Sequence, residues 1–190
     1  MPAHAPAELQ RLRTAIELVI DRFVDREATS EQLDAWASIL ESFAEHAAAS
    51  PPEALFWGIS GHRGIMGVMG MQGSAGFAPS PSLAGDTMTA RLTFSSRHEG
   101  HRGLAHGGLI AQAFDDFCGL FDTFVPGIRY TGQLTVHFLK PVPLNKDVLF
   151  EGAVVAKEGS RTMIEATATI DGVVYAEANA VMVAKSSAAW

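Results

Sequence analysis

One stretch of the chain, from Arg97 to Phe121, limits the folds that the sequence can adopt. It reads RHEGHRGLAHGGLIAQAFDDFCGLF and changes from a glycine- and histidine-rich loop into a helix pattern after Gly108. At about 100° per residue, its apolar side chains fall within roughly half of the helix circumference. They are Leu109, Ile110, Ala113, Phe114, Phe117, Cys118, Leu120 and Phe121. A helix with so wide an apolar face is expected to be buried along that face.

The other side of this helix carries Gln112, Asp115 and Gly119, with Asp116 at its edge. An acid on that side must face solvent, a partner subunit or a substrate cleft. A single exposed aspartate is usually only solvated, so a functional role for Asp115 needs further support from the residues around it.

Composition excludes several classes of protein. The chain has 190 residues, 47% of them hydrophobic and 18% charged, which suits one compact domain with an extension. Its net charge of -7, with no basic cluster, argues against nucleic-acid binding. A single cysteine gives no disulfide framework, and neither a signal peptide nor a membrane-spanning stretch is visible. We therefore expect a cytoplasmic protein with no membrane partner.

Alternating apolar and polar residues predict strands on both sides of the helix. The expected strands are Thr87–Phe94, Tyr130–Leu139, Asp147–Lys157, Arg161–Ile170 and Val173–Ala184. The last two are joined by Asp171-Gly172, a strong signal for a two-residue hairpin turn. One strand, one buried helix and a run of antiparallel strands predict an α+β fold in which the sheet curves around the helix.

The first part of the chain has a different pattern. Residues from Ala7 to about Arg26 show helical spacing, and Thr29 with Gln32 forms the pattern of a capping box for a second helix. We expect a helical extension over residues 1–52, a glycine- and methionine-rich connecting segment over 53–85, and the main domain over 86–190. The extension is predicted to cover a neighbouring surface, a ligand pocket or an oligomer interface.

The start of the central helix has the features of an oxyanion site. His106-Gly107-Gly108 places two glycines where backbone N–H groups point at a ligand and the helix dipole favours negative charge. Asp115, on the same helix, has the chemistry of a general base for water or of a direct nucleophile. Asp116 is the competing acid. Thr131 opens the next strand, where its hydroxyl can orient a water molecule or the carboxylate.

Other chemistries have weaker support. His98, His101 and His106 raise a metal hypothesis, but they lie in a glycine-containing stretch without regular ligand spacing, so we predict no metal and no cofactor. A serine triad lacks the GxSxG pattern. Cys118 sits on the apolar face of the helix, which favours a core role over a nucleophilic one.

Two segments, EGHRGLAHGGLIAQAFDD and TGQLTVHFLKPVPL, resemble the hotdog-fold acyl-CoA thioesterases of the phenylacetate-degradation (PaaI-type) group, within the 4-hydroxybenzoyl-CoA thioesterase superfamily. The resemblance covers roughly Asp86 to Lys185. It implies a hotdog fold, in which a curved antiparallel sheet wraps a long helix, and a homodimer formed edge to edge or a dimer of such dimers. No cofactor is implied.

The resemblance also implies roles for individual residues. Gly107 would polarise the thioester carbonyl, His106 would fix the loop, and Asp115 and Thr131 would match the catalytic acid and its hydroxyl partner from the opposite protomer. Many relatives carry an asparagine where this chain has Gly100, and Glu99 or His98 is a candidate substitute.

The resulting prediction is hydrolysis of an acyl-CoA thioester, with Asp115, Gly107, Thr131 and His106 as catalytic residues. Gly108, Asp116 and Glu99 are expected to contact the substrate. Candidate cations for the CoA phosphates are Arg97, Arg102, Lys140, Lys146 and Arg161. A non-catalytic hotdog protein that binds acyl-CoA or serves as a scaffold is the alternative.

Overall fold

The central helix, α3, spans Gly107–Phe124 and carries the buried face that the sequence predicts. The computed structural model describes residues 7–24, 27–48, 82–124 and 129–184. Within α3, the side chains of Ala113, Phe114, Phe117 and Cys118 are completely buried. This burial confirms the predicted core role of Cys118, and it fixes which side of the helix remains open to solvent or a partner.

A six-stranded antiparallel sheet packs against α3, in the order β1-β2-β4-β5-β6-β3. The strands are β1 (Ser82–Ala84), β2 (Thr87–Thr93), β3 (Arg129–Phe138), β4 (Asp147–Glu158), β5 (Arg161–Ile170) and β6 (Val173–Ala184). Buried and exposed residues alternate along β5 and β6, as expected for a sheet with one covered face. The predicted hairpin is confirmed, because Asp171 and Gly172 have φ values of 49° and 76°, both positive as a type I′ turn requires.

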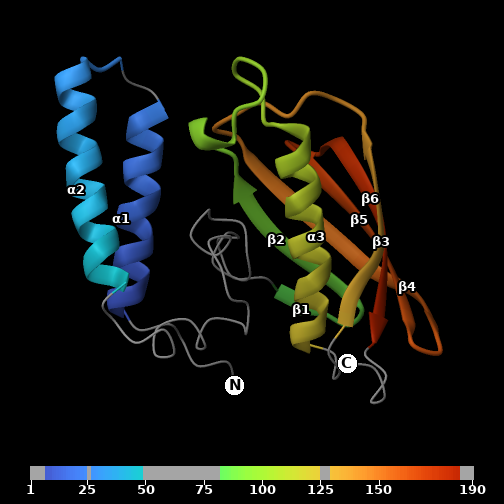
Figure 1. Ribbon diagram of the computed structural model, residues 1–190. Coiled ribbons are helices and arrows are strands. Elements are labelled where there is room, and N and C mark those ends of the chain that lie inside the picture. Colours follow the sequence, from blue (N-terminus) through green and yellow to red (C-terminus); the bar gives the residue numbers. More distant parts are fainter. Residues whose placement is uncertain (1–6, 25–26, 49–81, 125–128, 185–190) are drawn as a thin grey trace. The chain divides into compact units, whose positions relative to one another are not determined.

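The interface between α3 and the sheet is aromatic. The rings of Phe114 and Phe117 pack on Phe150 of β4, with centroid separations of 5.1 and 5.8 Å. Figure 1 shows α3 lying along the curved sheet formed by the other elements of this part of the chain. A long helix held against a curved antiparallel sheet is the hotdog fold, so the predicted α+β class and architecture are confirmed.

Gly152 sets the distance between α3 and β4. A Cβ atom on Gly152 would lie 2.7 Å from Cε1 of Phe117 and 3.0 Å from the backbone oxygen of Glu165. We expect Gly152→Ala to lower the free energy of unfolding by about 1–3 kcal/mol, because the added methyl group overpacks the core. Urea unfolding checks this value, and an unchanged midpoint would contradict the close approach of Phe117.

The strand β3 lies at one end of the sheet and pairs only with β6 among the described strands. Its other edge presents backbone N–H and C=O groups over a strand of ten residues. Proteins usually shorten, cover or charge such an edge, since it is a template for pairing with another chain. A large apolar side chain of this strand, Tyr130, is also exposed. β3 is therefore a surface suited to pairing with a second copy.

The chain divides into two compact units, Met1–Val68 and Met69–Trp190. The described part of the first unit consists of two helices, α1 (Ala7–Val24) and α2 (Ser30–Ala48). The predicted capping box is confirmed: Thr29 N–H donates to Gln32 Oε1 at 3.0 Å, and Gln32 N–H donates to Thr29 Oγ1 at 3.3 Å. Most of the predicted connecting segment lies outside the described residues, but its end contains β1, which pairs with β2.

Candidate active site

The N-terminus of α3 leaves one backbone donor open. Among the first four amides of the helix, those of Leu109 and Ile110 donate to the carbonyl oxygen of His106, at 2.9 and 3.1 Å. The amide of Gly108 donates to Nδ1 of the same histidine at 3.0 Å. The N–H of Gly107 has no hydrogen-bond partner among the residues that the structure describes. One N–H therefore remains for a ligand, at the end of the helix where the dipole favours negative charge.

This arrangement gives His106 a definite structural role. It is the N-cap residue of α3, and its side chain satisfies one amide that would otherwise lack a partner. Because Gly108 already donates to His106, the Gly108 amide is not available to a ligand while this cap is formed. The predicted role of Gly108 in substrate binding would therefore have to come from its lack of a side chain.

Hydrogen bonds hold the preceding loop against its surroundings. The N–H of His106 donates to the carbonyl oxygen of His98 at 2.8 Å, and that of Ala105 donates to Val142 at 2.9 Å. The carboxylate of Glu99 accepts a hydrogen bond from the amide of Gly103. His98 is buried, with Nδ1 accepting the amide of Ser95 at 2.8 Å. Both side chains thus build the loop, and a substrate contact by Glu99 stays a prediction.

Gly100 is explained by the close approach of this loop to His106. A Cβ atom on residue 100 would lie 2.7 Å from Cα of His106 and 3.0 Å from its Cβ. A side chain at this position therefore has no room unless the backbone shifts. The absence of a side chain at Gly100 lets the loop pack directly on the helix cap.

Asp115 and Thr131 form a side-chain pair. The hydroxyl of Thr131 donates to Oδ1 of Asp115 at 2.7 Å, linking α3 to the start of β3. This bond holds one carboxylate oxygen in place, while Oδ2 retains its capacity to accept a proton. The structure thus brings together two of the four predicted catalytic residues, which lie 16 positions apart in the chain.

The other two predicted catalytic residues, His106 and Gly107, lie at the N-terminus of α3, whereas Asp115 lies near the middle of the helix. Asp115 follows Gly107 by eight residues of continuous α3, which corresponds to about 12 Å along the helix axis. A carbonyl bound at the Gly107 amide is therefore too far from Asp115 of the same chain for direct proton transfer.

Asp116 has a different environment from its neighbour. It is half-buried, and its Oδ2 atom is buried with no hydrogen-bond partner among the described residues. Burial, followed by the charge of Asp115, raises the pKa of Asp116 from 3.8 to about 8. No basic side chain of the described residues is hydrogen-bonded to this oxygen. Asp116 is therefore mostly neutral at pH 7.

This environment predicts how stability depends on pH. Since the folded-state pKa of Asp116 lies above the ordinary value, folding takes up a proton between about pH 4 and pH 8. The stabilisation is complete below that range and is lost as pH rises through it. The free energy of unfolding should fall between pH 5 and pH 8 in both proteins. The fall should be smaller in Asp116→Asn than in the parent, by on the order of 1–3 kcal/mol. Denaturant unfolding at several pH values checks this, and identical pH slopes for both proteins would contradict it.

Other chemistries find little geometric support. In the described part of the chain, no group of three or more His, Cys, Asp or Glu side chains is placed to hold a metal ion. Burial, with a smaller contribution from Asp115, raises the pKa of Cys118 to about 12, so its thiol is not a nucleophile at neutral pH. Within the same residues, no helix is long and apolar enough to cross a membrane.

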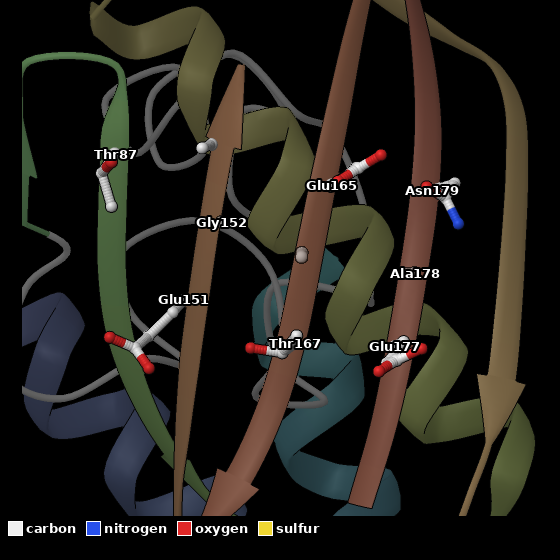
Figure 2. Close-up of a pocket in the computed structure, with 10 residues that line it drawn as sticks. Thr87, Glu151, Gly152, Glu165, Thr167, Glu177, Ala178 and Asn179 are labelled. Carbon is white, nitrogen blue, oxygen red and sulfur yellow. The ribbon is translucent and has the colours of Figure 1, made fainter. Parts of the chain in front are cut away.

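The face of the sheet turned away from α3 has a shallow hollow (Figure 2). Its lining includes the exposed carboxylates of Glu151, Glu165 and Glu177, from β4, β5 and β6. This hollow contains none of the predicted site residues, and its acids occupy the solvent-facing positions of alternating strands. We interpret it as the solvated outer face of the sheet.

Four of the five candidate cations for CoA phosphates are exposed, and Arg97 is half-buried. The exposed ones are Arg102, Lys140, Lys146 and Arg161. The Lys140 ammonium lies 5.9 Å from the centre of the Tyr175 ring, just beyond the end of β3. Lys140 follows Phe138, the last residue of β3, by two positions, and the ring of Phe138 lies beside Gly107.

The sheet and the central helix give the molecule the hotdog fold. Solved structures with the same fold are known. No protein-family model and no curated protein sequence matches the chain. A crystal structure of a thioesterase superfamily protein matches 96% of this chain and 97% of its own length, with a TM-score of 0.77 and 20% identity. The second unit of the chain thus has the same fold as thioesterase superfamily structures.

Two smaller structures match about half of this chain. A protein of Streptococcus mutans UA159, bound to acetyl-CoA, has a TM-score of 0.52 and 22% identity over 55% of this chain and 85% of its own. A hypothetical thioesterase of Streptococcus pneumoniae TIGR4, with coenzyme A, has a TM-score of 0.52 and 18% identity over the same shares. At these identities the likeness establishes the fold.

Proposed function

We propose that the protein hydrolyses an acyl-CoA thioester to a free carboxylic acid and coenzyme A. The observation that carries this proposal is the pair of half-sites on α3: an open N–H at Gly107, and a carboxylate at Asp115 held by Thr131. An open amide at a helix N-terminus suits the oxygen of a polarised carbonyl. A fixed carboxylate suits activation of water.

The site is formed by two copies of the chain. The separation of about 12 Å between Gly107 and Asp115 along one helix requires that the acid come from a second protomer. Pairing of β3 with its copy would extend the sheet across the dimer and satisfy the open edge. A dimer of such dimers would contain the same sites.

The proposed reaction consumes one water molecule for each thioester that is hydrolysed. Asp115 Oδ2 takes a proton from water as the oxygen attacks the thioester carbonyl, and the Gly107 N–H binds the resulting oxyanion. The tetrahedral intermediate then collapses, the C–S bond breaks, and the proton held by Asp115 goes to the CoA thiolate. Thr131 positions the carboxylate through its hydrogen bond to Oδ1. The products are the carboxylic acid and free CoA thiol.

The comparisons support this assignment through their ligands and variants. One similar structure contains acetyl-CoA and another contains coenzyme A. Two further structures of the Streptococcus pneumoniae thioesterase are of variants in which one aspartate and one threonine, respectively, are replaced by alanine. Those two positions are sixteen residues apart, the same separation as Asp115 and Thr131.

Release of free thiol from a panel of short, long and aromatic acyl-CoAs tests the proposal. Turnover of any member above the uncatalysed rate supports the hydrolase. Binding of acyl-CoA without turnover would instead favour the non-catalytic alternative. A single turnover in ¹⁸O-labelled water tests the two roles of Asp115, because a general base gives only labelled product. A nucleophile instead displaces the CoA thiolate to form an anhydride with the acyl group, and water attack on the Asp115 carbonyl of that anhydride delivers unlabelled oxygen to the product in the first turnover.

A further inference from the structure

The aromatic ring of Phe138 lies beside the open amide. Phe138 ends β3, and its Cζ and Cε1 atoms lie 3.6 and 3.7 Å from the position that a Cβ atom on Gly107 would occupy. Among the residues that the structure describes, no other atom lies within 4 Å of that position apart from the chain neighbours and the backbone of α3. The ring therefore forms the side-chain surroundings of Gly107.

The exposure of this ring is unusual for its place in the strand. Leu134 and Val136, which share its face of β3 by the two-residue alternation, are partly buried against the core. Phe138 continues the same row but is 54% exposed. Leaving so much of a phenylalanine in water gives up part of the stabilisation that full burial of its side chain would contribute. An apolar ligand at this position would recover that burial.

We propose that Phe138 is a specificity-determining residue that forms one wall of the acyl-binding subsite. The inference rests on the proposed function and assigns the substrate class: an apolar acyl group longer than acetyl. An oxygen hydrogen-bonded to the Gly107 N–H lies about 2.9 Å from that nitrogen. The carbon chain next to the bound carbonyl is then within van der Waals reach of the ring, which favours apolar chains by excluding water from them.

A chain-length series tests this assignment. We expect Phe138→Ala to lower the ratio of kcat/KM for octanoyl-CoA to that for acetyl-CoA by about tenfold or more, the scale of discrimination in apolar pockets. Leu139→Ala is the matched control, because Leu139 is adjacent and equally exposed at 52% but does not contact Gly107. Its ratio should stay at the parent value. An equal loss for both substrates in Phe138→Ala would overturn the assignment.

A binding measurement keeps this inference separate from the proposed hydrolysis. Calorimetry compares S-octyl-CoA, a thioether that cannot be hydrolysed, with free coenzyme A. We expect Phe138→Ala to weaken binding of the thioether by about tenfold and to leave that of coenzyme A unchanged. This result without turnover would retain the subsite and reject the hydrolase. Turnover in the parent, with unchanged binding of the thioether in the variant, would retain the hydrolase and reject the subsite at Phe138. No binding of either compound to the parent would reject both the subsite and the hydrolase.

Discussion

Asp115→Asn is expected to lower kcat for acyl-CoA hydrolysis by about a hundredfold or more, the scale for loss of a general base. Asparagine has the same shape and can still accept the hydrogen bond from Thr131, so the geometry of the pair is retained. What is lost is the ability to take a proton from water. Free-thiol release at saturating substrate measures the effect, and calorimetry should show acyl-CoA binding close to that of the parent.

Thr131→Val provides the graded comparison for this variant. It removes the donor to Asp115 Oδ1 while keeping the carboxylate and the volume of the side chain. A smaller loss than that of Asp115→Asn is expected, because Thr131 only positions the acid. Full activity in Asp115→Asn would contradict the assignment and make Asp116 the candidate base.

Gly107→Pro is expected to lower kcat by about 10²–10³-fold, the scale for removal of one oxyanion donor. Proline removes the N–H proposed to bind the carbonyl oxygen. It is also favoured at the first position of a helix, where the amide has no intrahelical partner. Because the amides of Gly108, Leu109 and Ile110 keep their bonds to His106, the helix cap should survive.

Gly107→Ala is the matched control for the proline variant. A Cβ atom at this position would meet the Phe138 ring at the ordinary contact distance of 3.6 Å. Alanine keeps the N–H, so kcat should stay within about tenfold of the parent, with any effect confined to the fit of the substrate beside Phe138. Equal losses in the alanine and proline variants would show that bulk at residue 107, and not its amide, controls the rate.

Local sequence patterns were sufficient for much of the fold. The bounds of β5 and β6, the turn at Asp171-Gly172 and the capping box of Thr29 and Gln32 follow from alternation and turn chemistry over a few residues. The buried face of α3 follows from its period of about 3.6 residues. Such features depend on near neighbours in the chain, which is why they can be predicted without knowing the tertiary arrangement.

Contacts between distant segments could not be predicted in the same way. The capping of Gly108 by His106 is a rotamer choice that the letters HGG do not fix. The ring of Phe138 reaches Gly107 only because β3 passes beside the start of α3, a consequence of the strand order. The close packing of Gly100 on His106 likewise depends on the path of the loop. In each case the missing information is the tertiary placement of a segment, not its residue type.

A mixed dimer tests the shared site most directly. Chains carrying Asp115→Asn and Gly107→Pro would be co-expressed with different tags, and the species containing both would be purified for thiol-release assays. If each site combines Gly107 of one copy with Asp115 of the other, one site of the mixed dimer contains both substitutions. The second site then contains neither substitution. The account predicts about half of the parent activity, far above that of either homodimer. A mixed dimer as inactive as the two single variants would contradict a site built from Gly107 of one copy and Asp115 of the other.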